Sequence, residues 1–232
     1  MKIAIIIPMA EEREYYLEHF QLEAKERIGA VEFEHFTHGS NDIYLGLSGI
    51  GKVQAAMALT SLLATTKIDL IFLTGSAGSL QENVRVNDLV VADAFAYHDV
   101  NAVNAGPYVI GQIPQEPAIY SLANDYREQF VSFLHDEQIA FQSGLIVTGD
   151  TFVSTNALKE AIKANFPTAL GVEMEGAAMA QVASHFAVPL IGLRAISDNG
   201  DDNADFDFDQ FVRRVGKTAA QTISKFLDTD IL

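Results

Sequence analysis

Short runs of apolar residues recur along the chain and alternate with segments in which apolar and polar residues mix at helical spacing. The first run, at 2–7, predicts a buried strand, and the charged segment 11–20 after it has helical composition. Alternation around a glycine-containing turn predicts a hairpin over 31–49. Later apolar runs predict strands at 69–75, 88–97, 143–150, 171–175 and 190–197. Helices are expected at 52–66, near 121–135, at 156–166, at 176–187 and near 208–227.

This order of elements predicts an α/β protein. Strands that alternate with helices favour a central mixed, largely parallel β-sheet flanked by helices. A long connection containing Pro and Gly, at 101–117, interrupts the pattern. No repeat, low-complexity tract or linker divides the chain, so we expect a single domain over 1–232.

Composition narrows the classes of function. Fifteen basic residues against 31 acidic ones give a net charge of −16, which argues against partners that are nucleic acids or anionic membranes. The chain has no cysteine, which excludes disulfides, a thiolate nucleophile and a Cys-based zinc site. The apolar run at the N-terminus favours a first strand over a signal peptide, and no run approaches the roughly 18 residues of a membrane span. We therefore expect a cytoplasmic protein.

Acidic residues gather at the predicted strand ends. In α/β folds ligands bind outside the carboxyl ends of the strands, so these ends are the place to look for a site. Three of the turns there also carry glycine beside serine or threonine, and almost no basic group accompanies them. Such a lining suits an uncharged, polyhydroxylated ligand better than a phosphate. The acids are Glu11, Glu12, Asp150, Glu173, Glu175 and Asp198.

Several motifs fail the tests for better-known sites. "SGIGK" and "TGSAG" match neither the phosphate-loop spacing nor the dinucleotide fingerprint, and "TGSAG" is not a hydrolase elbow. The acidic stretch 198–209 is not a calcium loop, because Phe206 stands where glycine is needed and Val212 where the bidentate Glu is needed. His98 and the other histidines show no metal-ligand spacing. The sequence predicts no metal and no cofactor.

The segment "VEMEG" at 172–176 leaves two alternatives open. If it is fully extended, Glu173 and Glu175 point to one face of the strand. Alternatively Glu175 opens the following helix, where a carboxylate interacts favourably with the helix dipole. Arg194 lies inside a later apolar run, and a buried guanidinium needs a carboxylate partner, for which these two acids are the natural candidates.

Together these segments resemble one family. "GIGK" at 49–52, "TGSAG" at 74–78, "SGLIVTGD" at 143–150, "GVEMEGAA" at 171–178 and "RAISD" at 194–198 are similar to the purine/uridine phosphorylase-like nucleosidases, above all to those acting on 5′-methylthioadenosine and S-adenosylhomocysteine. The similarity runs nearly end to end. It implies hydrolysis of these substrates, and of 5′-deoxyadenosine, to adenine and the 5′-substituted ribose.

The resemblance also implies roles for single residues. Asp198 matches the general acid that protonates N7 of adenine, Glu12 the residue that activates the attacking water, and Glu175 the residue that holds the ribose hydroxyls. An ordinary Asp has a pKa near 3.9, so burial or a neighbouring acid has to raise it for Asp198 to keep a proton at neutral pH. The expected substrate-binding residues are Met9, Ile50, Ser76, Phe152, Val153, Glu173, Met174 and Phe208, the last from the acidic loop. Arg194, Ser197 and Gly78 are expected to support them.

The same resemblance implies a homodimer in which the neighbouring subunit closes the 5′ end of the site. Ala102 and Ala105 stand there where bulkier apolar residues are common, which predicts a roomier 5′ end. Three rival functions stay open: a purine nucleoside phosphorylase, a nucleosidase for futalosine or adenosine, and a non-catalytic nucleoside-binding or storage protein. A phosphorylase needs basic residues near the phosphate, whereas this chain has Glu12 at the corresponding turn.

Overall fold

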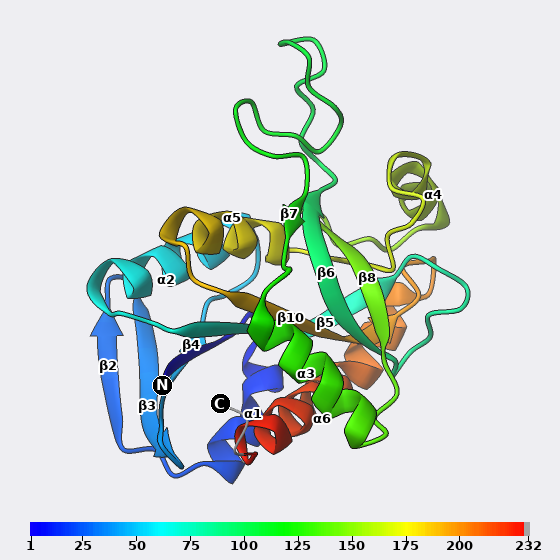
Figure 1. The fold of residues 1–232 in the computed structure, drawn as a ribbon. Helices are drawn as coiled ribbons and strands as arrows, with labels where there is room; N and C mark the ends of the chain where they lie inside the picture. The colour runs from blue at the N-terminus through cyan, green and yellow to red at the C-terminus, as the bar shows by residue number, and fades with distance from the viewer. Residues whose placement is uncertain (230–232) are drawn as a thin grey trace.

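A mixed β-sheet of ten strands runs through the computed structural model, which describes residues 1–229 (Figure 1). The strands are β1 (Lys2–Ile7), β2 (Ala24–Ile28), β3 (Val31–His38), β4 (Asn41–Leu47), β5 (Leu70–Ser79), β6 (Leu89–Tyr97), β7 (Tyr120–Ser121), β8 (Gln142–Thr148), β9 (Gly171–Glu173) and β10 (Leu190–Asp198). The helices are α1 (Ala10–His19), α2 (Lys52–Thr65), α3 (Asp125–Asp136), α4 (Asn156–Asn165), α5 (Gly176–Phe186) and α6 (Ala204–Leu227). The predicted α/β class with a central mixed sheet and flanking helices is confirmed.

The sheet is partly closed on itself. Its strand order is β10-β6-β8-β9-β5-β1-β4-β3-β2. Because β5 also pairs with β10, the five strands β10, β6, β8, β9 and β5 form a closed ring. Within residues 1–229, five strand pairings are parallel and five are antiparallel. β1, β5 and β10 are mutually parallel, so their carboxyl ends meet at one edge. The following turns and helix starts place the acidic residues at that edge.

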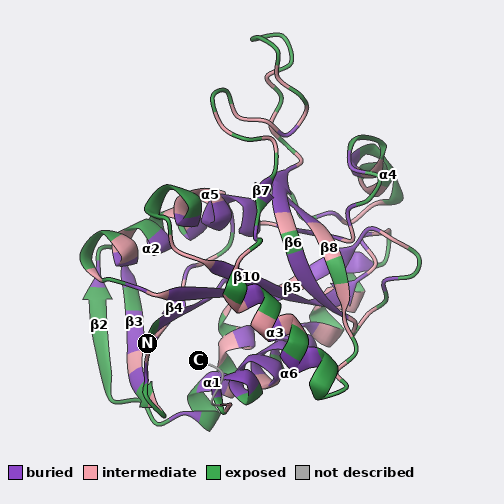
Figure 2. Cartoon of the chain, viewed as in Figure 1, coloured by how far each residue is buried: buried purple, intermediate pink, exposed green. Residues whose placement is uncertain are grey.

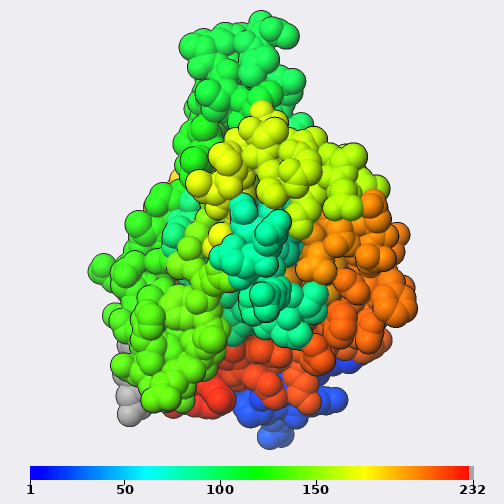
Figure 3. All heavy atoms as spheres, turned by 90° about the vertical axis from the view of Figure 1, so that its right-hand side faces the viewer, coloured from blue at the N-terminus to red at the C-terminus, as the bar shows by residue number. Residues whose placement is uncertain are grey.

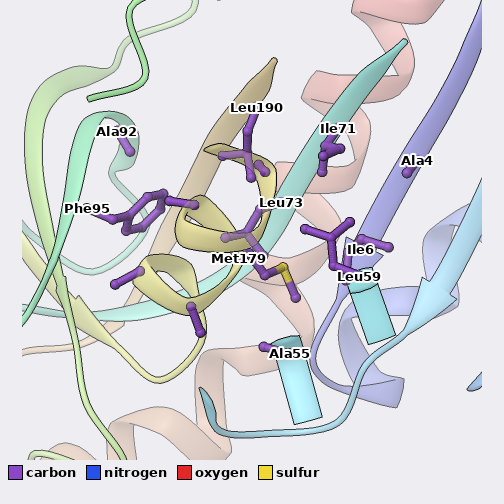
Figure 4. Packing of buried hydrophobic residues seen from close by; sticks show 14 of the residues in the cluster. Ala4, Ile6, Ala55, Leu59, Ile71, Leu73, Ala92, Phe95, Met179 and Leu190 are labelled. Carbon is purple, nitrogen blue, oxygen red and sulfur yellow. The ribbon is translucent and has the colours of Figure 1, made fainter. Parts of the chain in front are cut away.

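Hydrophobic side chains cover both faces of the sheet. In β1, Ala4 and Ile6 pack toward α2 and α5, while Ile3, Ile5 and Ile7 pack toward α1, α3 and α6. Figure 4 shows the first layer, with Met179 of α5 between the sheet and α2. The central strands and the helix faces turned toward them are buried (Figure 2). This packing fixes the strand ends that carry the acids.

Four details differ from the sequence-based expectation. The edge strand β2 was not predicted, because four of its five residues are exposed and it has no apolar period. The two-residue strand β7 is too short to leave a pattern. The strand expected over 171–175 ends at Glu173, and the last helix begins at Ala204 rather than near 208. Phe208 therefore lies on α6 and not on a loop, because Asp205 and Asp207 fit the first helical turn, where carboxylates interact favourably with the dipole.

The connection between β6 and β7 projects from the body of the molecule. Residues 101–117 form turns and bends without helix or strand, as the sequence indicated. Figure 1 shows this segment above the side where α2 and α5 lie, and the space-filling view in Figure 3 shows it standing clear of the rest. None of the helices within residues 1–229 combines the length and apolar character needed to cross a membrane.

Candidate active site

A cavity of about 320 Å³ lies at the carboxyl ends of the parallel strands β1, β5 and β10. All the site residues that the resemblance implies line it except Val153, which lines a smaller adjoining cavity together with Phe152 and Asp198. Of the acids expected at the strand ends, Glu11 and Asp150 do not line it. Segments far apart in the sequence thus meet at one place. The lining residues are Pro8, Met9, Glu12, Ile50, Ser76, Ala77, Gly78, Phe152, Val172, Glu173, Met174, Glu175, Arg194, Ser197, Asp198 and Phe208.

Glu12 lies in the first turn of α1, and its side chain is buried. One carboxylate oxygen, Oε1, accepts hydrogen bonds from both the backbone N–H and the hydroxyl of Ser76, each at 2.7 Å. The other, Oε2, accepts from the backbone N–H of Met9 at 3.2 Å. Burial raises the pKa of Glu12, although the charge of Arg194 and these hydrogen bonds act against it. The group is therefore a better proton acceptor than an ordinary glutamate.

Asp198 ends β10 and is also buried. Its Oδ2 accepts from the Ser197 hydroxyl at 2.7 Å and its Oδ1 from the Gly200 N–H at 2.8 Å. A Cβ atom on Gly78 of the neighbouring strand would lie 2.7 Å from Oδ1, so only glycine lets the carboxyl sit there. Burial raises the pKa of Asp198, which favours the protonated form that can donate to a ligand.

Glu173 and Glu175 converge on one cation, the buried guanidinium of Arg194. Glu175 does not continue the strand: it is the N-cap residue directly before α5, as in the second of the two alternatives, although its side chain does not cap the helix. Its Oε2 accepts from Arg194 Nη2 at 3.2 Å and its Oε1 from the Gly51 N–H at 2.9 Å. Burial raises the pKa of Glu175 to about 7, against the opposing charge of Arg194. The ion pairing predicted for Arg194 is confirmed.

The carboxylate of Glu173 serves the fold as well as the cavity. It accepts from the backbone N–H groups of Glu175, at 3.1 Å, and Gly176, at 2.8 and 2.9 Å, and so caps α5. It also accepts from the hydroxyl of Thr148, which in turn accepts from the Ala177 N–H at 2.8 Å. No role was predicted for Thr148, although a hydroxyl at the end of an apolar strand was a signal for one.

An apolar wall faces these acids. The rings of Phe152 and Phe208 lie 5.5 Å apart at 74°, an edge-to-face contact between the loop after β8 and the second turn of α6. Ile50 is 51% exposed and Phe152 is 38% exposed, so both present free apolar surface at the cavity. Pro8, Ala77 and Val172 also line it, and their residue types gave no sequence signal. The site suits a ligand with one flat apolar part and one hydroxylated part.

Among residues 1–229, no group of three or more His, Asp or Glu side chains is arranged to hold a metal ion. The cavity lining contains a single basic residue, Arg194, and both carboxylates of the VEME segment already engage it. Most ionisable groups of the lining are carboxyl groups, and burial raises the pKa of three of them, Glu12, Glu175 and Asp198.

Comparison with known proteins agrees with this geometry. The sequence model of the phosphorylase superfamily matches residues 2–228. The 5′-methylthioadenosine/S-adenosylhomocysteine nucleosidase of Haemophilus influenzae is 37% identical over 229 residues, which are 98% of this chain and 99% of the relative. The chain belongs to the phosphorylase superfamily. It belongs there among the 5′-methylthioadenosine/S-adenosylhomocysteine nucleosidases.

Two solved structures have the same fold as this chain. The S-adenosylhomocysteine nucleosidase of Streptococcus pyogenes, solved with 5-methylthiotubericidin, superposes with a TM-score of 0.94 at 36% identity, covering 100% of this chain and 98% of its own. The futalosine hydrolase of Helicobacter pylori superposes with a TM-score of 0.91 at 31% identity, covering 98% and 97%. The superfamily scaffold is thus shared by nucleosidases with different substrates, and the choice of substrate depends on the site.

Proposed function

We propose that the protein hydrolyses the N-glycosidic bond of 5′-methylthioadenosine and S-adenosylhomocysteine, and of 5′-deoxyadenosine, to give adenine and the 5′-substituted ribose. The observation that carries the proposal is the arrangement of Glu12, Glu175 and Asp198, three buried carboxyl groups around one cavity. Relatives named for this activity match nearly the whole chain. A protein that only stored nucleosides would have no need for a buried proton donor.

Each carboxyl group has a different task in the proposed reaction. Asp198, whose raised pKa favours the protonated form, donates a proton to N7 so that adenine leaves as a neutral base. Glu175 accepts hydrogen bonds from the ribose hydroxyls and stabilises the positive charge that develops on the ring as the base departs. Glu12 takes a proton from the water that attacks the anomeric carbon. Arg194 holds Glu175 in place, and Ser197 does the same for Asp198.

Different residues of the cavity bind the base, the sugar and the 5′ substituent of the substrate. Phe152 stacks on the adenine ring and the Val153 backbone contacts its edge, which agrees with their place beside Asp198. Met174 lies against the sugar, and Phe208 covers the 5′ thioether. Met9, Ile50, Ser76, Gly78 and Glu173 complete the lining.

A phosphorylase reaction is disfavoured by the charges of the cavity. Phosphate as nucleophile needs a free cationic partner, yet the one basic side chain of the lining, Arg194, is paired with Glu173 and Glu175. A phosphate beside Glu12 would also meet a like charge. Futalosine and adenosine remain the alternative substrates, and the similarity to a futalosine hydrolase makes a direct comparison of rates necessary.

We also propose a homodimer in which the second copy closes the 5′ end of the site. Apolar side chains are exposed on the side of α2 and α5: Val53 is 77% exposed, and Met57, Phe186 and the cavity residue Ile50 are exposed too. A groove there is lined by Val53, Val100, Ile113, Val182 and Phe186, and the projecting segment rises beside it (Figure 1). Covering this surface would remove apolar area from water. Ala102 and Ala105 on that segment then leave a roomier 5′ end.

A single domain over 1–232 and a cytoplasmic location also stay predictions.

The variant Asp198→Asn tests the proposal. It should reduce the turnover number for 5′-methylthioadenosine by about 100-fold or more, because general acid catalysis contributes about that much. Binding of 5′-methylthioadenosine, measured by calorimetry, should remain. Asp209→Asn, an exposed acid on α6, is the matched control and should keep the wild-type rate. Equal turnover in both variants would contradict the role of Asp198.

A further inference from the structure

Asp150 lies beside the site without lining it. It follows β8, its side chain is half-exposed, and neither of the two cavities touches it. Its carboxylate oxygen Oδ1 accepts a hydrogen bond at 2.8 Å from the backbone N–H of Lys52, the first residue of α2. Asp150 therefore caps a helix from a segment about a hundred residues away in sequence, and no side chain within α2's own N-terminal turn does so.

The capped turn carries a contact to Glu175. The N–H of Gly51, directly before Lys52, donates to Glu175 Oε1 at 2.9 Å. Gly51 has φ +95°, a conformation that favours glycine, so this turn has a specific shape that must be held. Two consecutive N–H groups are thus each bound by a carboxylate, one inside the cavity and one outside it.

Asp150 is itself held by a third segment. Asp99 Oδ2 accepts from the Asp150 N–H at 2.9 Å and from Lys52 Nζ at 2.6 Å. Lys52 Nζ also lies 3.5 Å from Asp150 Oδ2. Burial pushes the pKa of Asp99 up, but the hydrogen bonds from Lys52 and Asp150 outweigh it and hold this pKa below its usual value. Asp99 is therefore charged at neutral pH, and the three residues form a connected polar clamp.

We propose that Asp150 is a positioning residue, which fixes the start of α2 so that the Gly51 N–H meets Glu175, and fixes the loop that carries Phe152. Phe152 follows Asp150 by two residues and lines the cavity. The same clamp thereby sets the ribose-holding carboxylate and the ring proposed to stack on the base. This inference rests on the proposed function, because it assigns Asp150 an effect on that reaction.

The substitution Asp150→Ala removes the acceptor for the Lys52 N–H. We expect kcat/KM for 5′-methylthioadenosine to fall about tenfold. A misaligned hydrogen bond at Glu175 would stabilise the transition state less well, and a tenfold loss corresponds to about 1.4 kcal/mol in the activation free energy. The Gly51 hydrogen bond lowers the pKa of Glu175, so a loosened Gly51 raises that pKa and moves the acidic limb of kcat/KM to higher pH. A role in stability alone would not move this limb.

Two further variants make the comparison specific. Asp150→Asn keeps an oxygen that can accept from Lys52 and should retain most of the activity. Asp69→Ala removes a carboxylate that accepts from the Lys2 N–H, also at 2.8 Å, at the opposite end of the sheet. It should leave kcat/KM and the pH profile unchanged. If Asp150→Ala does not fold, Asp150→Ser, whose shorter side chain withdraws the acceptor, takes its place in the comparison.

The outcomes separate the two proposals. If the wild-type protein releases no adenine from 5′-methylthioadenosine, the proposed function fails. If the wild type is active but Asp150→Ala matches Asp69→Ala in kcat/KM and in its acidic limb, the positioning role of Asp150 is wrong. Equal losses in Asp150→Asn and Asp150→Ala would also overturn it, because the acceptor oxygen would then be irrelevant.

Discussion

Arg194 Nη2 donates a hydrogen bond to Glu175 Oε2 at 3.2 Å, and both side chains are almost completely buried. The same guanidinium pairs with Glu173 and lies close enough to Glu12 to affect its pKa. One cation therefore faces three carboxyl groups within the interior. When all three acids are ionised the cluster is net negative, which suits a site that has to stabilise positive charge on a ribose ring.

Removing this cation should destabilise the protein strongly. Arg194→Met leaves the carboxylates without their buried partner, and breaking a buried ion pair costs about 3–5 kcal/mol. Urea unfolding at pH 7 would measure the change in the free energy of unfolding. Arg213→Met is the control, because Arg213 pairs with Glu14 at the exposed surface, and its removal should change stability little. Similar values for both variants would show that Arg194 does not compensate the acids.

The activity should depend on the protonation of Glu175. Its pKa of about 7 means that the carboxylate needed to hold the hydroxyls and face the cationic ring is lost as the pH falls through that value. We expect kcat/KM to decline below about pH 7. Glu175→Gln should have a low activity from which this limb is missing. A limb of unchanged position in Glu175→Gln would assign it to another group, such as Glu12.

Thr148 should contribute to stability through the cap of α5. Thr148→Val keeps the shape of the side chain but leaves the buried Ala177 N–H without its acceptor, at a cost of about 1–3 kcal/mol. Thr65→Val, at the exposed end of α2, should change the free energy of unfolding by less than about 0.5 kcal/mol. Denaturant unfolding of the two variants measures the difference, and equal values would contradict the capping role.

The variant Asp198→Asn should be more stable than the wild type at alkaline pH. Because burial raises the pKa of Asp198 in the folded state, its contribution to stability is complete at pH values below the unfolded pKa and is lost as the pH rises through the folded pKa. An amide carries no such charge, and its oxygen can still accept from the Gly200 N–H. The Tm difference should be positive at pH 8 and vanish near pH 3. A lower Tm than wild type at pH 8 would contradict this account.

Much of the site was predictable because its residues stand at strand ends. Apolar runs locate β1, β5 and β10, and their parallel arrangement brings their carboxyl ends together, so Glu12 after β1 and Asp198 at the end of β10 meet in one cavity. The cost of a buried guanidinium predicted that Arg194 needs a carboxylate partner, with Glu173 and Glu175 as the natural candidates, and the structure shows that both pair with it.

The rest depends on contacts that no local pattern records. The start of α6 was missed because aspartates are poor in helix interiors but favourable in the first turn, so the composition of 198–209 indicates a loop. Thr148 and Asp150 cap helices that lie far away in sequence, and only the folded chain shows which N–H groups they reach. The charged edge strand β2 carries no apolar alternation, since only one of its residues is buried.

The most direct test is an assay of adenine release from 5′-methylthioadenosine, S-adenosylhomocysteine, futalosine and adenosine, each with and without phosphate. We expect rapid turnover of the two thioethers, equal rates in both conditions, and free 5′-substituted ribose as the sugar product even when phosphate is present. Turnover that stops without phosphate, or a sugar phosphate as product, would contradict hydrolysis. Futalosine or adenosine turned over faster than both thioethers would contradict the proposed substrates.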